Sequence, residues 1–156
     1  MAFFAGYYIY TVDRKGRVNI PASFRKHLPE KEGESNVYLM VREVNGFSYL
    51  TILPQEYFQE ITKEIADASG GPINPNPEGM RALLKLMNSV QECHYDDQGR
   101  LIIPRHFLEM THIKDRVRII GTRDYLQLWD PDTHDQYVEG KLQKEVEPSE
   151  EKDENS

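Results

Sequence analysis

The chain has 156 residues, of which 38% are apolar and 29% charged, enough for one ordinary domain or two small modules with a shared core. Nine tyrosines, six phenylalanines and one tryptophan exclude disorder of the whole chain, and a single cysteine excludes an internal disulfide and a cysteine-rich zinc site. No apolar run approaches the ~20 residues that cross a bilayer, so we expect no membrane partner.

The net charge of −7 is unevenly distributed along the chain. Residues 145–156 contain six acidic side chains and one basic one, which predicts a disordered, solvated tail. Without this tail, 20 acidic residues face 18 basic ones. Within the remainder, Asp13–His27 carries five basic residues and one carboxylate, a local charge of +4. The field over one face, and not the sum over the molecule, governs phosphate binding.

The first twelve residues carry no charge and could be mistaken for a signal peptide. They lack a basic start, and tyrosines interrupt the apolar run. We therefore predict a half-buried aromatic strand over Tyr7–Val12 and a cytoplasmic protein.

The chain repeats itself. Asp13–Pro21 recurs as Asp96–Pro104, 83 residues later, and Leu50–Leu53 corresponds to Leu126–Trp129 at an offset of 76. Two copies, and not three or more, predict modules paired about a pseudo-twofold axis. We predict modules over residues 1–68 and 78–144, joined by a linker rich in Gly and Pro over 69–77.

Each copy predicts the same order of elements: a strand, a glycine turn, a strand, a short helix that begins at proline, and a β-hairpin. In the first copy these cover Tyr7–Val12, Arg17–Ile20, Pro21–Leu28, Val37–Arg42 and Phe47–Leu53. In the second they cover Glu92–Tyr95, Arg100–Ile103, Pro104–Met110, Val117–Gly121 and Tyr125–Trp129. Helical patterns cover Gln55–Ala68, Glu78–Val90 and Thr133–Lys144. The predicted class is α+β, mostly β, with both modules in one compact unit.

Both copies contain the turn Asp-x-x-Gly-Arg. Glycine permits a tight turn, and the aspartate can accept hydrogen bonds from loop N–H groups or pair with the arginine. The projecting cations suit phosphate oxygens and, for arginine, the edge of guanine. A single copy would favour a turn that serves folding alone. The second copy, with Arg14 and Lys15 added to the first, favours binding to nucleic acid.

These motifs resemble the MraZ family of bacterial regulators, which are built from two swapped-hairpin modules of the AbrB type. The resemblance covers residues 1–144. In the first module it rests on Gly6, Asp13-x-Lys15-Gly16-Arg17, Ile20-Pro21 and Arg25. In the second it rests on Glu92-Cys93, Asp96-x-x-Gly99-Arg100, Gly121 and Leu128-Trp129-Asp130.

The resemblance implies a cytoplasmic, nucleoid-associated transcription factor that assembles into a ring. It would repress the division and cell-wall gene cluster, including its own promoter, by binding short tandem DNA repeats. The implied DNA-binding residues are Arg14, Lys15, Arg17, Arg25 and Arg100. The residues that shape the turns are Asp13, Gly16, Asp96 and Gly99. The expected partners are double-stranded DNA and further copies of the chain, with no catalytic residue, cofactor, metal or small-molecule substrate.

Two departures from the family pattern weaken parts of this expectation. Ala5 stands where the family often has arginine, which removes one phosphate contact. Asp97 and Gln98 stand in the second turn where the first has Arg14 and Lys15. We therefore assign direct DNA binding mainly to the first module and a supporting role to the second.

Other classes of function find little support. The chain lacks the Gly-x-Ser-x-Gly, Gly-x-x-x-x-Gly-Lys and His-Glu-x-x-His motifs of common enzymes. The segment 130–135 resembles a calcium loop but lacks its glycine and its bidentate glutamate, so a helix start explains it better. Cys93 and His94 are adjacent on a strand and point to opposite faces, which predicts a buried thiol and an exposed imidazole.

Two apolar features are interpreted as packing. Trp129 ends an alternating strand and is predicted to lie in the core, with base stacking a distant second. The stripe of Met80, Leu83, Leu84 and Met87 predicts packing between modules or between subunits. A protein-interaction module of the antitoxin type remains the alternative function, although a basic tail would suit it better than the acidic one present.

Overall fold

The computed structural model describes residues 3–28, 36–96 and 98–140. The strands are β1 (Tyr7–Thr11), β2 (Arg17–Asn19), β3 (Asn36–Val44), β4 (Phe47–Pro54), β5 (Val90–His94), β6 (Arg100–Ile102), β7 (Arg116–Gly121) and β8 (Leu126–Trp129). The helices are α1 (Ala22–Arg25), α2 (Gln55–Ala68), α3 (Pro77–Asn88), α4 (Arg105–Thr111) and α5 (Pro131–Val138). The predicted class, α+β and mostly β, is confirmed.

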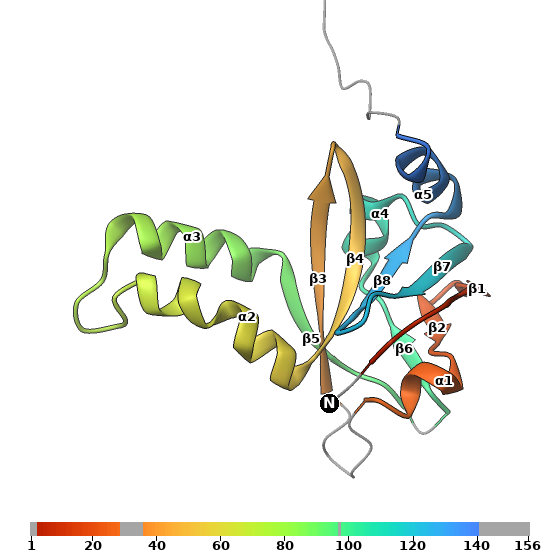
Figure 1. The fold of residues 1–156 in the computed structure, drawn as a ribbon, viewed down its shortest axis with the longest axis horizontal. Helices are drawn as coiled ribbons and strands as arrows, with labels where there is room; N and C mark the ends of the chain where they lie inside the picture. Colours follow the sequence, from red (N-terminus) through yellow and green to blue (C-terminus); the bar gives the residue numbers. More distant parts are fainter. Residues whose placement is uncertain (1–2, 29–35, 97, 141–156) are drawn as a thin grey trace, which may run out of the picture.

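The two halves of the chain share their sheets. Six strands form an antiparallel sheet in the order β1-β7-β8-β4-β3-β5, and β2 pairs with β6 in a separate ribbon (Figure 1). The first strand of each half pairs with the hairpin of the other half, β1 with β7 and β5 with β3. The equivalent strands of the two halves are β1 and β5, β3 and β7, and β4 and β8. Exchanging the members of each pair gives the same order read from the other edge of the sheet, as a pseudo-twofold axis requires. The module boundaries at residues 68 and 78 stay predictions.

The core is common to both halves. The largest fully buried side chains are Trp129, Phe4, Phe24, Phe47 and Phe107. Trp129 stacks on Tyr49 with ring centroids 4.6 Å apart, and its Nε1 donates to Gln127 Oε1 over 2.9 Å. Its predicted place in the core is confirmed. Burial of aromatic side chains from both halves against one another makes each half depend on the other.

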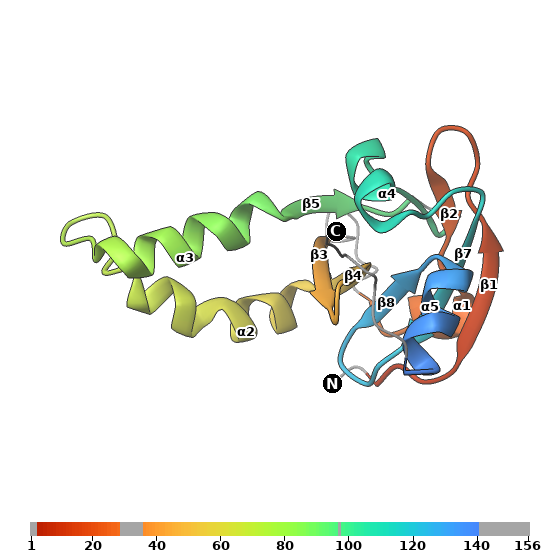
Figure 2. The same ribbon diagram turned by 90° about the horizontal axis from the view of Figure 1, so that it is seen from above.

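Helices α2 and α3 form a hairpin that projects from the strands, and we call it the helical arm (Figures 1 and 2). A small cluster of Met40, Leu53 and Phe58 attaches the base of α2 to the sheet. No residue of α3 is buried, and Leu84 and Met87 are 56% and 40% exposed. The packing of the apolar stripe of α3 between modules or between subunits therefore stays a prediction.

Several elements differ from the sequence expectations. The predicted strand at Tyr7–Val12 is present as β1, but it is not half-buried: Tyr7, Tyr8, Ile9 and Thr11 are exposed. The reason is its position, because β1 lies at the edge of the sheet, where only Tyr10 of the strand packs against the core, together with the flanking Phe4 and Val12.

The helix boundaries also differ. Pro21 and Pro104 precede α1 and α4 in extended conformations, and are not their first helical residues. Their carbonyl oxygens still accept the first helical hydrogen bonds. Val90, predicted to end a helix, instead begins β5 beside Met40. The last predicted helix is shorter, and its residues 141–144 lie outside the described residues, as do the acidic tail and Asp97.

Candidate nucleic-acid interface

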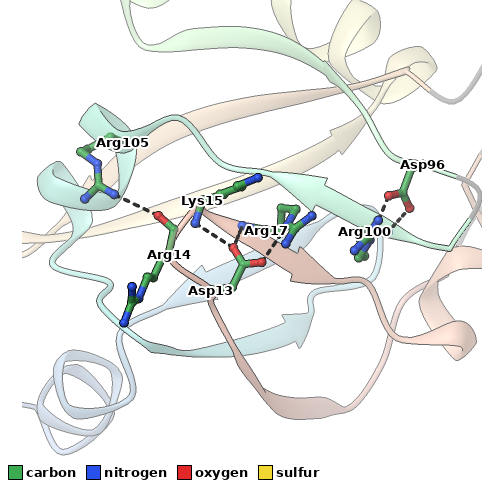
Figure 3. Close-up of polar contacts among 7 residues, drawn as sticks. All are labelled: Asp13, Arg14, Lys15, Arg17, Asp96, Arg100 and Arg105. Atoms are coloured by element: carbon green, nitrogen blue, oxygen red, sulfur yellow. Dashed lines mark hydrogen bonds and ion pairs between the residues drawn. The ribbon is translucent and has the colours of Figure 1, made fainter.

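The first turn, which we call loop 1 (residues 13–17), is closed by one carboxylate (Figure 3). Asp13 Oδ1 accepts from the backbone N–H groups of Lys15 and Arg17 over 2.9 and 2.8 Å. Asp13 Oδ2 accepts from Arg17 Nε over 2.7 Å. The backbone N–H of Gly16 donates to the Asp13 carbonyl oxygen over 2.9 Å. Both oxygens of one side chain thus hold the whole loop in shape.

Loop 2, residues 96–100, repeats this arrangement. Asp96 Oδ1 accepts from the backbone N–H groups of Gln98 and Arg100 over 3.0 and 2.8 Å, and Oδ2 accepts from Arg100 Nε over 3.0 Å. The repeat in sequence is therefore a repeat in hydrogen bonding. Each motif aspartate bonds the loop N–H groups and also pairs with the arginine.

These contacts lower the pKa of both aspartates. The first cause is the backbone N–H of Arg17 for Asp13 and that of Arg100 for Asp96, with the guanidinium groups contributing further. Both carboxylates are ionised at neutral pH and remain exposed. Part of the positive charge of Arg17 and Arg100 is consequently neutralised within the loop.

The glycine of loop 1 is required by the close approach of the two halves. Gly16 has φ +80°, and a Cβ there would lie 2.6 Å from the carbonyl oxygen of Ile103. The backbone N–H of Ile103 donates to the Gly16 carbonyl over 2.9 Å, and that of Ile20 donates to Gly99 over 2.7 Å. The short ribbon of β2 and β6 therefore joins both loops into one rigid surface.

The predicted DNA-binding residues occupy different environments. Arg14 and Lys15 are exposed at loop 1, while Arg17 and Arg100 are half-buried beside their aspartates. Arg25, which the sequence groups with Arg14 and Lys15, lies instead against Gly99 of loop 2. The structure thus separates the basic cluster of the first half between both loops.

One basic residue at the site was missed by the sequence reasoning. Arg105, the first residue of α4, donates from Nη2 to the Arg14 carbonyl oxygen over 3.2 Å (Figure 3). It is 91 residues from Arg14 in the chain. Its place after Pro104 in the repeated segment is the only signal in the sequence, and the matching residue in the first half is Ala22.

The adjacent Cys93 and His94 and the calcium-like segment have the structures predicted for them. Cys93 is buried, which raises the pKa of its thiol, and His94 is exposed. Asp130 caps α5 by accepting from the backbone N–H of Thr133 over 3.0 Å, so the calcium-like segment is a helix start. Within residues 3–28, 36–96 and 98–140, no three His, Cys, Asp or Glu side chains gather in a way that could hold a metal ion. None of the helices in these ranges is long and apolar enough to span a membrane.

The comparison with known proteins agrees with the internal repeat of the chain. The family model described as "MraZ protein, putative antitoxin-like" matches residues 3–71 and again residues 86–155. The two matches begin 83 residues apart, which is the offset between loop 1 and loop 2. The chain belongs to the MraZ family.

Curated relatives in this family carry the name "Transcriptional regulator MraZ". The one from Cytophaga hutchinsonii is 29% identical over 139 residues, covering 88% of this chain and 86% of the relative. Those from Mycolicibacterium smegmatis and Corynebacterium urealyticum are 30% and 32% identical over 134 residues, covering 86% of this chain and 85% of each relative. The predicted membership of the MraZ family is confirmed, and its relatives are named as regulators and not as enzymes.

Proposed function

We propose that this protein is a DNA-binding transcriptional regulator that acts through the basic loops of a ring-shaped homo-oligomer. It binds short tandem repeats upstream of a division and cell-wall gene cluster and represses that cluster, including its own promoter. Its place is the cytoplasm, at the nucleoid. No catalytic step, cofactor or metal is part of the proposal.

The observation that carries this proposal is the pair of rigid loops. In loop 1 the aspartate satisfies the loop backbone and pairs with Arg17, while Arg14 and Lys15 stay exposed. Loop 1 presents these exposed cations on a backbone that is already ordered, so less of the chain has to be ordered when phosphate oxygens bind. The names of the relatives support the same conclusion.

The mechanism follows from the number of contacts. One protomer offers few phosphate contacts, so it binds weakly and with a steep dependence on salt. A ring presents many such loops to regularly spaced repeats, which raises avidity without new contacts. Loop 1 supplies most of the direct contacts and loop 2 supports it. Occupancy of the promoter then blocks transcription.

The test is an electrophoretic mobility shift with the protein's own upstream DNA. The double substitution Arg14→Ala/Lys15→Ala should weaken binding by about tenfold or more, since two phosphate contacts are lost. The matched control is Arg81→Ala/Lys85→Ala, which removes two exposed cations from the helical arm. Binding that the loop substitution leaves unchanged, or a flat plot of log K against log salt, refutes the loops as the DNA contact.

The antitoxin-like alternative is favoured by the description of the family model and by exposed apolar side chains such as Phe3 and Tyr7. A protein-interaction module uses such side chains as anchors in a partner's groove. The same mobility shift separates the two functions. No shift of upstream DNA at low salt would move the assignment to a protein partner.

A further inference from the structure

The pseudo-twofold arrangement places the helix of each half beside the loop of the other half. Helix α4 lies at loop 1, where Arg105 donates to the Arg14 carbonyl and Leu108 approaches Gly16. Helix α1 lies at loop 2, where Arg25 packs over Gly99. The cations at each loop therefore come from both halves of the chain.

We infer that each loop is completed as a phosphate site by an arginine from the opposite half, Arg105 at loop 1 and Arg25 at loop 2. The inference rests on the proposed function and names the residues that serve it. It adds Arg105 as a DNA contact. It also moves Arg25 from the basic cluster of the first half to the anion site of the second.

The argument for Arg25 begins with its unfavourable surroundings. Its side chain lies so close to loop 2 that a Cβ on Gly99 would be 2.6 Å from Cδ and from Nη1 of Arg25. Its Nε is buried and has no hydrogen-bond acceptor among the residues that the structure describes. A buried donor without an acceptor lowers stability, so this guanidinium does not serve the fold alone, and its four Nη N–H groups are the ones that can meet an anion at loop 2.

The repeat shows that packing alone does not require a charge at this position. The residue that matches Arg25 at the offset of 83 is Leu108, which is buried against loop 1. A leucine thus fills the equivalent space in the other half. Loop 2 has Asp97 and Gln98 where loop 1 has its two additional cations. Arg25 supplies to loop 2 a cation that takes the place of the two additional cations of loop 1.

The environment of Arg105 at loop 1 differs from that of Arg25 at loop 2. Arg105 is exposed, and its hydrogen bond to the Arg14 carbonyl uses one of the five guanidinium N–H groups. That bond fixes the guanidinium beside loop 1, at the rim of a cavity of about 620 Å³ that Arg14 and Lys114 also line. Glu109 and Asp115 line the cavity as well. Asp13 lines it too, so the cavity as a whole carries three cations and three carboxylates. The cations that concern DNA are Arg105 and Arg14, which meet at loop 1.

Two substitutions separate charge from shape. Arg25→Leu installs the residue that the equivalent position already holds, so the packing on loop 2 is kept and the charge is lost. Arg105→Gln removes the charge and keeps a side-chain N–H donor, although on a shorter side chain. Arg81→Gln on the helical arm is the matched control. Thermal unfolding should show Arg25→Leu and Arg105→Gln folded, with midpoints close to that of the unchanged protein.

We expect each of the two substitutions to weaken binding to upstream DNA by about tenfold and to lower the slope of log K against log salt by about one, as the loss of one phosphate contact requires. The control should change neither. Affinity and slope that stay unchanged in both variants overturn the inference. If Arg105→Gln binds upstream DNA with full affinity and only Arg105→Ala binds it more weakly, Arg105 stabilises the loop through its hydrogen bond. That result also overturns its role as a DNA contact.

Double substitutions test the crossing itself. Arg25→Leu should be coupled to Arg100→Ala in loop 2 and additive with Arg14→Ala in loop 1, because only residues at one site share a contact. Arg105→Gln should show the reverse pattern. Arg25→Leu coupled to Arg14→Ala and additive with Arg100→Ala would return Arg25 to loop 1 and overturn the crossing.

A second probe separates this inference from the proposed function. Each variant is also eluted from heparin-agarose with salt, which measures anion binding without any promoter sequence. Suppose the unchanged protein fails to shift upstream DNA. Earlier elution of Arg25→Leu and Arg105→Gln than of Arg81→Gln then supports the crossed sites and refutes only the promoter function. Equal elution of all three refutes the crossed sites.

Discussion

At the scale of single residues, the Asp-x-x-Gly-Arg turn uses one arginine for two purposes. Arg17 Nε is taken by Asp13, so the residue that sequence reasoning offers as a DNA contact also shapes its loop. The cations best placed to meet DNA are the exposed Arg14 and Lys15. A substitution at Arg17 therefore disturbs shape and charge together, whereas Arg14 and Lys15 report on charge alone.

The first prediction concerns the titration of Asp13. Because folding lowers its pKa below the ordinary value of about 4, the ionised carboxylate stabilises the fold above that pH and the stabilisation is lost as the pH falls through the folded pKa. In Arg17→Ala the pKa should rise only part of the way back, since the backbone N–H groups remain. Side-chain carboxyl NMR measures this. The pKa of Asp96 is the internal control, and a full return of Asp13 to the ordinary value contradicts the prediction.

The second prediction concerns Gly16. Gly16→Ala should lower the free energy of unfolding by about 2–4 kcal/mol, since it combines a positive φ with a clash against the backbone of Ile103. Gly71 has φ +75° and no atom within 4 Å of a Cβ. Gly71→Ala should therefore show the conformational cost alone, about 1 kcal/mol. Urea unfolding compares the two, and equal losses would mean that the halves do not meet at Gly16.

At the scale of elements, α5 is attached to the sheet by the packing of Tyr137 on Trp129 and by polar contacts from one arginine of β7. Arg118 Nη1 donates to Asp135 Oδ1 over 2.7 Å and lies 2.9 Å from His134 Nδ1. A guanidinium can only donate, so Nδ1 must be the unprotonated, accepting nitrogen. Burial, followed by the charge of Arg118, lowers the pKa of His134. Helix α5 is thus held most firmly while His134 is neutral.

The third prediction is a loss of stability in mild acid. The folded pKa of His134 lies below the unfolded value of about 6.5, so its neutral form stabilises the fold above that pH, and the contribution is lost as the pH falls through the folded pKa. The thermal midpoint should fall between pH 7.5 and 5, and His134→Gln should reduce that fall. His94→Gln, at an exposed histidine of β5, should keep it. The same pH dependence in His134→Gln would exclude His134 as its source.

At the scale of the whole molecule, two exposed apolar surfaces lie at opposite ends of the protomer (Figure 2). One is the helical arm, with Ile61, Leu84 and Met87 exposed, and the other surrounds β1, with Tyr7 and Ile9. Apolar side chains gathered in this way usually meet a partner. Two different surfaces at opposite ends suit a head-to-tail contact, and such a contact forms a ring when the rotation between subunits closes.

The fourth prediction tests the arm in assembly. Leu84→Gln/Met87→Gln should lower the mass of the oligomer in sedimentation and weaken binding to DNA with several repeats, while binding to a single repeat is unchanged. Arg81→Gln/Lys85→Gln, on the same helix, is the control for charge and helix propensity. An oligomer of full mass in the first variant would show that the arm does not join subunits.

Much of this architecture could be predicted from local sequence. The bounds of α2 were predicted as observed, because an amphipathic pattern and a preceding proline both act within a few residues. The hairpin of Val37–Arg42 with Phe47–Leu53 was also predicted, and Asn45 and Gly46 in its turn both have positive φ. The hydrogen bonds that each motif aspartate makes within its loop also join residues at most four apart.

The sequence alone therefore determined the duplicated loops, the strands and helices around them, and the family. Only the tertiary structure decided that β1 is an exposed edge, that each half completes the sheet of the other, and that Arg25 and Arg105 cross to the opposite loops. The physical reason is one of range. Turns and helices are closed by backbone bonds between near neighbours, whereas partners some eighty residues apart are chosen by the burial of a common core.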